Sequence, residues 1–322
     1  MEKTFEAFTE QIKEETEKLL EEGFTAGITE VMKNNGTVQT GLAITEKTGK
    51  LTTVLYLEQY FSLYMQGEPV KGLAKEIYET FQTQKALNEV EHRVPSIQDF
   101  SLSRENIVCR LVHFKMNEAS LLQLPHIRIT DLAATFYVYM GDYTDGRLFS
   151  VVTNQLMEHW GISLHEMLFP AMENTQRLSP VQFNSMEEIF KETGITQQLS
   201  EELGGLLSES GLYVLTNAQR QNGAVSILYP GVLKRVSEKL EDDLIIIPSS
   251  IHEVLLTPYQ GGWMLDSMEK IITEVNREEV TLSERLSTHA YTYRRQGNQI
   301  HAVLNGKEAL PGFPLSRLYP DK

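Results

Sequence analysis

The stretch Ser226–Tyr259, SILYPGVLKRVSEKLEDDLIIIPSSIHEVLLTPY, predicts how the rest of the chain is organised. It joins a strand, a helix and two further strands with almost no spare residues between them. Pro230 suits the first position of a helix, where its missing N–H costs nothing. From there to Leu240, apolar residues recur at helical spacing, which predicts a helix with one apolar face.

The second half of this stretch predicts two neighbouring strands. Residues 244–247, Leu-Ile-Ile-Ile, are mostly β-branched, and such a run is typical of a strand that is covered on both faces. Pro248 ends this strand, and Ser249 and Ser250 predict a turn. A second strand is expected to return over residues 251–256. A central strand therefore follows the helix directly.

Similar units flank this stretch on both sides. Asn222-Gly223 and Gly297-Asn298 predict tight turns between paired strands, and Asp266 is a candidate cap for a helix between those pairs. The connections are too short for parallel crossovers. The sequence therefore predicts an α+β fold in which antiparallel β-hairpins alternate with helices, in mixed layers of helix and sheet.

The amino-terminal part predicts a smaller, separate body. An apolar stripe indicates a helix over residues 5–23, and Asn35-Gly36 predicts a hairpin turn, with two further helices behind it. Residues 83–95 are polar and lack a clear period, which is typical of a boundary. We expect two domains, 1–90 with a small antiparallel sheet and 96–322 with the repeated hairpin and helix units.

Composition excludes several classes of protein. Hydrophobic residues make up 41% and charged residues 23%, so a folded globular protein is expected. A net charge of −15 repels nucleic acid and anionic membranes, and no apolar run is long enough to span a bilayer. The amino terminus lacks the pattern of a signal peptide, which favours a cytoplasmic location. Cys109 lies in an apolar pattern and is interpreted as a buried thiol.

No motif for a cofactor or a metal is present. The sequence has no glycine-rich phosphate loop, no dinucleotide fingerprint and no nucleophile elbow after a strand. The histidines are scattered, without the spacing of three or four that ligands on one helix need. We therefore expect neither a cofactor nor a metal site.

Two segments contain residue types that can do chemistry. His126, Arg128 and Asp131 lie within six residues in PHIRITD, where they could bind an anion or form a capped turn with solvated charges. Ser249, Ser250 and His252 lie together in PSSIHE, where a Ser–His pair is one hypothesis and backbone hydrogen bonding in a turn is the other. The turn interpretation is favoured in both segments.

Several segments resemble an uncharacterised bacterial family, domain of unknown function 5688, found in Gram-positive and largely gut genomes. The similar segments are LYLEQY (55–60), LPH (124–126) with DLA (131–133), YVLTN (213–217), LYPG (228–231) and above all IPSSIHEV (247–254). The resemblance covers nearly the whole chain. It implies a cytoplasmic bacterial protein, and it implies no activity, cofactor or catalytic residue.

Two hypotheses for function follow. The first is a non-enzymatic protein-binding or regulatory protein, because an acidic surface without cofactor motifs suits a protein partner. The alternative is a hydrolase or transferase whose site is assembled from His126, Asp131, Ser249, Ser250 and His252, since catalytic groups need be near only in space. Convergence of at least two of these side chains in a pocket would favour the enzyme.

Overall fold

The computed structural model describes residues 4–47, 52–88, 97–143, 146–193, 211–262 and 265–319. The chain divides into two compact units, residues 1–94 and 95–322. Both contain helices and antiparallel sheets, which confirms the predicted α+β class. Among the described helices, none is both long enough and apolar enough to cross a membrane.

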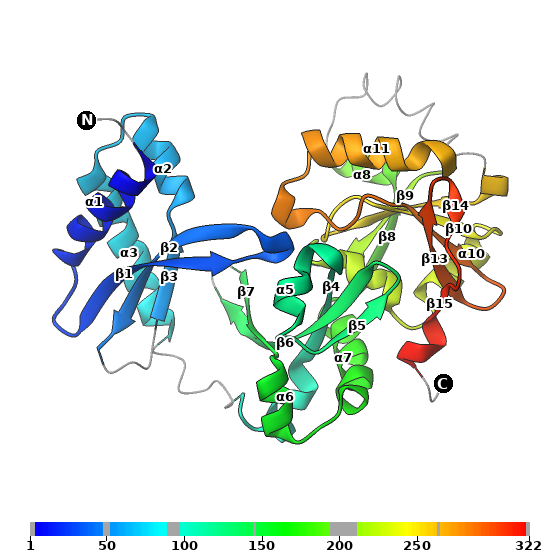
Figure 1. Ribbon diagram of the computed structural model, residues 1–322, viewed down its shortest axis with the longest axis horizontal. Coiled ribbons are helices and arrows are strands. Elements are labelled where there is room, and N and C mark those ends of the chain that lie inside the picture. Colours follow the sequence, from blue (N-terminus) through cyan, green and yellow to red (C-terminus); the bar gives the residue numbers. More distant parts are fainter. Residues whose placement is uncertain are drawn as a thin grey trace. The chain divides into compact units, whose positions relative to one another are not determined.

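The first unit is a three-stranded antiparallel sheet in the order β1-β2-β3, with α1 and α3 packed on one face (Figure 1). Its elements are α1 (Phe5–Glu17), β1 (Phe24–Met32), β2 (Val38–Glu46), β3 (Thr52–Tyr56), α2 (Glu58–Met65) and α3 (Val70–Asn88). The predicted hairpin is confirmed, and Asn35 in its turn has a φ of 58°. Asparagine tolerates this left-handed conformation better than most residues.

One end of the β1–β2 hairpin extends beyond the third strand. The β1–β2 pairing runs from Phe24 opposite Glu46 to Met32 opposite Val38. β3, however, pairs with β2 only over Gly41–Thr45. Residues 30–40 therefore form a two-stranded segment, which we call the hairpin arm.

The second unit contains a smaller and a larger antiparallel sheet. The smaller sheet has the order β4-β6-β5, with β7 also paired to β6. Its strands are β4 (Ile107–His113), β5 (His126–Ile129), β6 (Leu132–Tyr143) and β7 (Gly146–Val151). Cys109 is buried on β4, and burial raises the pKa of its thiol well above the usual value, which confirms the interpretation of this residue.

The larger sheet has the order β14-β13-β12-β10-β11-β9-β8, with β15 also paired to β13. Its strands are β8 (Val181–Ser185), β9 (Tyr213–Asn217), β10 (Leu244–Pro248), β11 (Val254–Pro258), β12 (Tyr291–Arg294), β13 (Gln299–Leu304), β14 (Lys307–Glu308) and β15 (Phe313–Pro314). β10 lies between β11 and β12, and the prediction of a central strand is confirmed.

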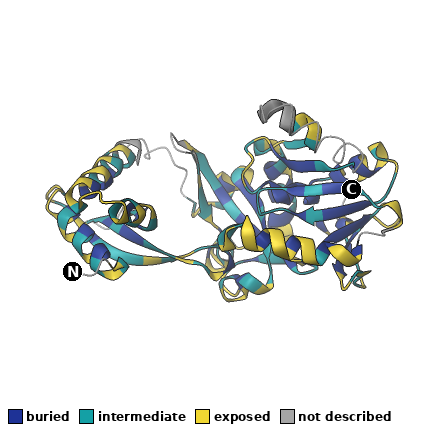
Figure 2. Cartoon of the chain, turned by 90° about the horizontal axis from the view of Figure 1, so that it is seen from above, coloured by how far each residue is buried: buried dark blue, intermediate teal, exposed yellow. Residues whose placement is uncertain are grey.

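Helices pack on these sheets, and the buried core consists of side chains from both helices and strands. The helices are α4 (Phe100–Ser103), α5 (Glu118–Leu121), α6 (Asn154–Trp160), α7 (Leu164–Leu178), α8 (Met186–Thr193), α10 (Val232–Lys239) and α11 (Leu265–Glu278). Buried residues follow the strands of the large sheet, and the outward side of the helices is exposed (Figure 2). A separate small cluster lies between α11 and the sheet.

Short 3₁₀ turns connect many of these elements. They are η1 (Asn34–Gly36), η3 (Arg104–Asn106), η4 (Lys115–Asn117), η5 (Gly223–Leu228), η6 (Gln260–Gly262), η7 (Leu282–Glu284) and η8 (Leu315–Leu318). η5 corrects the strand predicted after Asn222-Gly223. All six of its residues are buried, and Ser226 donates to the Thr216 carbonyl oxygen, so this segment packs as a compact turn rather than as a strand.

Four predicted boundaries differ from the structure. Asp266, predicted to cap its helix, lies inside α11, because the helix already begins at Leu265. α1 ends at Glu17 rather than Gly23, because the following residues turn toward β1. α10 begins after Gly231, which caps it with a left-handed φ of 68°, so Pro230 precedes the helix. The strand predicted from residue 251 begins at Val254, because Ser250 and Glu253 close a longer turn through a backbone hydrogen bond.

Candidate functional site

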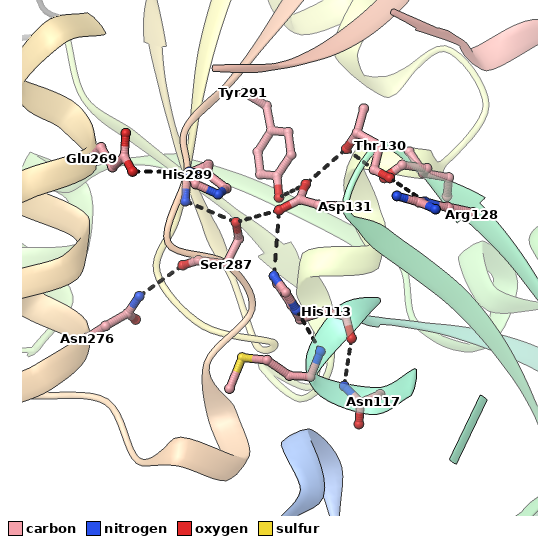
Figure 3. A network of polar contacts seen from close by, with 12 residues as sticks. His113, Asn117, Arg128, Thr130, Asp131, Glu269, Asn276, Ser287, His289 and Tyr291 are labelled. Carbon is pink, nitrogen blue, oxygen red and sulfur yellow. Dashed lines mark hydrogen bonds and ion pairs between the residues drawn. The ribbon is translucent and has the colours of Figure 1, made fainter. Parts of the chain in front are cut away.

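Asp131 is the centre of a polar network in the second unit (Figure 3). It forms, with Thr130, the two-residue turn between β5 and β6, since Ile129 and Leu132 are directly paired. Thr130 has a φ of 57°, which permits so tight a turn. Ile129 and Leu132 are both buried, so the turn that carries the carboxylate is anchored on each side.

Two hydroxyl groups from the large sheet and the loop before it donate to this carboxylate. The Tyr291 hydroxyl lies 2.7 Å from Oδ1 of Asp131, and the Ser287 hydroxyl lies 3.2 Å from Oδ2. Burial, and after it the charge of Asp131, raises the pKa of Tyr291, so the phenol remains a proton donor. The carboxylate therefore joins the smaller sheet to the larger one.

His113, at the end of β4, has one ring nitrogen in a hydrogen bond and the other within ion-pair distance of Asp131. Nδ1 accepts the backbone N–H of Met116 at 3.0 Å, and Nε2 faces Oδ2 of Asp131 at 3.7 Å. An imidazole that accepts at one nitrogen carries its proton on the other, so Nε2–H points at the carboxylate. A general base needs a free nitrogen within reach of a substrate. His113 therefore acts here as a link rather than as a base.

A second histidine extends the network toward α11. The backbone N–H of His289 donates to the Ser287 hydroxyl at 3.0 Å, and its Nδ1 lies 3.7 Å from Oε1 of Glu269. This distance is too long for a hydrogen bond, and Nδ1 is buried without one. Asn276 of α11 donates to the Ser287 carbonyl oxygen at 2.9 Å. The loop before β12 is thus held from both sides.

The network predicts a loss of stability at acidic pH through His113. Burial is the main cause that lowers the pKa of this histidine. The unfolded chain therefore binds more protons than the folded one as the pH falls below about 6.5, the ordinary histidine value. The contribution of His113 to the free energy of unfolding is therefore complete above about pH 6.5 and decreases as the pH falls below that value. Denaturant melts at a series of pH values would measure this dependence.

His113→Asn removes the titrating ring and keeps an acceptor for the Met116 N–H, so its stability should depend less steeply on pH between about 7 and 5. The exposed His159 on α6 gives a matched control, and His159→Asn should keep the slope of the parent. If the free energy of unfolding depended on pH equally in the parent and in His113→Asn, His113 would not be the source of the pH dependence.

His126 and Asp131, which the sequence grouped, lie at opposite ends of β5. Nδ1 of His126 is 2.9 Å from the Leu124 carbonyl oxygen, and its ring packs against Phe114. The contacts of Asp131 described above do not include His126. Proximity in sequence did not bring the two side chains together, because β5 extends between them.

Ser249, Ser250 and His252 lie in the turn between β10 and β11. The Ser250 hydroxyl accepts the backbone N–H of His252 at 3.0 Å, and the Ser249 hydroxyl lies 3.4 Å from Glu253 Oε1. Nδ1 of His252 accepts the backbone N–H of Asn222 at 3.2 Å, while Nε2 faces Glu284 at 3.5 Å. Neither serine hydroxyl is hydrogen bonded to the imidazole. The five candidates therefore lie in three separate sets of contacts.

Sequence reasoning missed His113, Ser287, His289 and Tyr291. Ser287, His289 and Tyr291 alternate along one segment, STHAY, and such alternation places side chains on one side of an extended chain. That pattern was a usable signal. Nothing local pointed to His113. Within the described residues, no group of three or more His, Cys, Asp or Glu side chains is arranged to hold a metal ion.

The fold and the network define an α+β protein in whose second unit a carboxylate links two sheets. The chain belongs to the Family of unknown function (DUF5688), which matches residues 5–295. No curated protein and no solved structure matches it. The suspected family is confirmed, and family membership assigns no activity to the polar network.

Proposed function

We propose that this chain is a cytoplasmic bacterial protein that binds a protein partner, without catalysis, through the hairpin arm. The observation that carries the proposal is an exposed apolar pair at the end of the arm. Met32 and Val38 lie directly opposite each other and are 58% and 52% exposed. Directly paired side chains on one sheet face act together as one contact surface.

The two side chains project from the same face of the sheet as the core residues of the first unit. Side chains alternate along a strand, so Met32 shares a face with Ala26 and Ile28, which belong to the core of the first unit or pack against it. The paired Glu30 and Thr40 lie between that core and the apolar pair. The pair is thus separated from the core of its own unit.

The arm is fixed to the body of the unit at its root, through Thr40, and near its turn, through Lys33. The backbone N–H of Thr40 donates to Oε1 of Glu58 at 2.7 Å, and the Lys33 ammonium hydrogen bonds to the Tyr56 hydroxyl and lies over its ring. An isolated two-stranded hairpin is marginally stable in water. These contacts order the arm before binding, which reduces the entropy that binding costs.

Two further observations support a binding role. His113 and His252 have both ring nitrogens engaged in internal contacts, so neither offers a free base in the free protein. The net charge of −15 disfavours a nucleic acid partner, because phosphate neutralisation supplies most of that affinity. A protein that offers an apolar or basic surface is the partner that this chemistry suits.

Val38→Asp is expected to weaken partner binding by at least about tenfold, because it places an unpaired charge in an apolar contact. The measurement is affinity capture of the tagged chain from its native host, with quantitative mass spectrometry, followed by titration of the purified partner. The melting temperature of the variant should stay close to that of the parent, because the residue is exposed.

Met65 on α2 gives a matched control, since it is in the same unit and is also 52% exposed. Met65→Asp should retain the partner. If Val38→Asp retains the partner as well as Met65→Asp does, the arm is not the binding surface. If no protein binds the parent in a saturable way, the proposal itself fails.

A further inference from the structure

A small pocket in the second unit lies beside β4, the end of α7 and the loop after β9. Its lining includes Arg110, Arg147, Phe149, Ser179 and Gln219. Its cavity volume is about 30 Å³. A buried water needs on the order of 10–15 Å³ by this kind of measure, so the pocket holds roughly two groups of that size.

The pocket is cationic in an acidic protein. The chain has 44 aspartate and glutamate residues, yet none of the residues that line the pocket is one of them. Two arginines are among those residues. A cleft lined by one sign of charge attracts a ligand of the opposite sign.

Arg110 is the unpaired cation of this pocket. Its guanidinium stacks on the rings of Tyr137 and Phe149, with its central carbon 4.2 and 4.3 Å from their centroids. Among the described residues, no carboxylate forms an ion pair with it. Burial lowers the pKa of Arg110, although a guanidinium remains charged at neutral pH. Ring stacking covers its faces, and the Tyr137 side chain also hydrogen bonds to it, so the remaining N–H groups of its edge are the ones left for a ligand.

Arg147 differs from Arg110 because its hydrogen bonds are already made. Its Nε lies 3.1 Å from Oδ1 of Asp142, and its Nη1 donates to the Leu178 carbonyl oxygen and the Ser179 hydroxyl at 2.8 and 3.1 Å. These contacts hold Arg147 at the rim. Its charge is balanced by Asp142, whereas Arg110 forms no ion pair with a carboxylate among the described residues.

The side-chain amide of Gln219, in the same lining, has an oxygen without a hydrogen-bond partner. Its Oε1 is buried without a hydrogen bond. A buried polar atom left without a partner is costly, so this amide is a candidate ligand contact. Turning the amide over exchanges its oxygen and nitrogen, which would offer an N–H group to an anion. The loop itself is fixed, since Asn217 donates to the Gln221 carbonyl oxygen at 2.8 Å.

Cys109 and Thr175, which line this pocket, are not arranged as nucleophiles. Cys109 also lines it, but burial raises the pKa of its thiol and keeps the sulfur protonated. Thr175 donates to the Ala171 carbonyl oxygen and accepts the Cys109 backbone N–H, so its hydroxyl is occupied. The pocket is therefore suited to binding.

We propose that the Arg110 pocket binds a carboxylate group. Two carboxylate oxygens match both the volume of the pocket and the paired N–H groups of a guanidinium edge. The carboxylate can belong to a small metabolite or to the carboxyl terminus of a peptide, because the chemistry of recognition is the same. The site lies in the second unit and is independent of the hairpin arm.

Titration of the full chain with acetate, at low ionic strength, should show saturable binding by calorimetry and an increase in melting temperature. Arg110→Gln should reduce affinity at least about tenfold, and Arg110→Lys should also weaken binding, because an ammonium cannot form the paired contact. Arg317→Gln removes the same charge at an exposed position and should bind like the parent. Circular dichroism would show that each variant is folded.

The source of the carboxylate is distinguished by triglycine with a free or an amidated carboxyl terminus. Tighter binding of the free peptide than of acetate, with loss on amidation, assigns the site to a peptide terminus. Equal binding of acetate and free peptide assigns it to small carboxylates. Absence of binding for both, binding of inorganic phosphate in preference to acetate, or equal affinity of Arg110→Lys, Arg110→Gln and the parent would each overturn the proposal.

Discussion

Ile246→Ala is expected to lower the free energy of unfolding by about 2–5 kcal/mol, the range for large truncations at well-packed core positions. Ile246 is fully buried on β10, directly opposite Leu256 of β11 and Tyr291 of β12. Both neighbours are buried strand residues, so the surrounding chain has little freedom to fill the cavity. Denaturant melts of parent and variant would measure the loss.

Ile247→Ala makes the same truncation one position along the strand, on a side chain that is partly exposed. It should cost less than Ile246→Ala, because part of that side chain is in water in both states. Equal losses for the two variants would show that the greater burial of Ile246 does not set the cost of truncation. A change in the denaturant slope would instead indicate an altered unfolded state.

The sequence predicted β10 well because its composition has a single physical explanation. A run of Leu-Ile-Ile-Ile needs cover on both faces, and only a central strand provides it. The turns at Asn35 and Asn298 were predicted for a similar reason, since each needs a left-handed residue that asparagine supplies. Sequence patterns predict the structure correctly where only one local conformation explains the residues.

The segment after Asn222 shows where local rules fail. Asn222 has a left-handed φ of 51°, as a turn signal predicts, but the next residues form a buried 3₁₀ turn. Their apolar character is explained equally well by a strand or by a compact buried segment. What decides between them is packing against the neighbouring β9 and against β4, which is remote in sequence. Tertiary contacts therefore override the pattern here.

The candidate site was predicted only in part for the same reason. Asp131 was singled out, yet its two hydroxyl donors are 156 and 160 positions away in the chain. Nothing in the neighbourhood of Asp131 indicates which distant segment meets it. The Arg110 pocket is similar, because a lone arginine in a strand gives no sign that its carboxylate partner is missing. Both features depend on how distant segments meet.

Asp131→Ala is expected to lower the free energy of unfolding by about 2–4 kcal/mol. The change removes the acceptor of the Tyr291 hydroxyl, which is buried, and the acceptor of the Ser287 hydroxyl. Hydrogen bonds to a charged group are worth more than neutral ones. The side chain of Asp131 is 25% exposed, so water offsets part of the loss.

Asp142→Ala is a matched control, because it removes a carboxylate whose side chain is 68% exposed and which pairs with Arg147. Exposed pairs contribute up to about 1 kcal/mol, so this loss should be clearly smaller. Tyr291→Phe removes the donor alone, and the double variant with Asp131→Ala completes a mutant cycle. Because the two groups interact directly, their losses should be less than additive, with a coupling of about 0.5–3 kcal/mol. Additive losses would show that the Tyr291 hydroxyl and Asp131 do not stabilise each other, and the carboxylate would then not be the link between the two sheets.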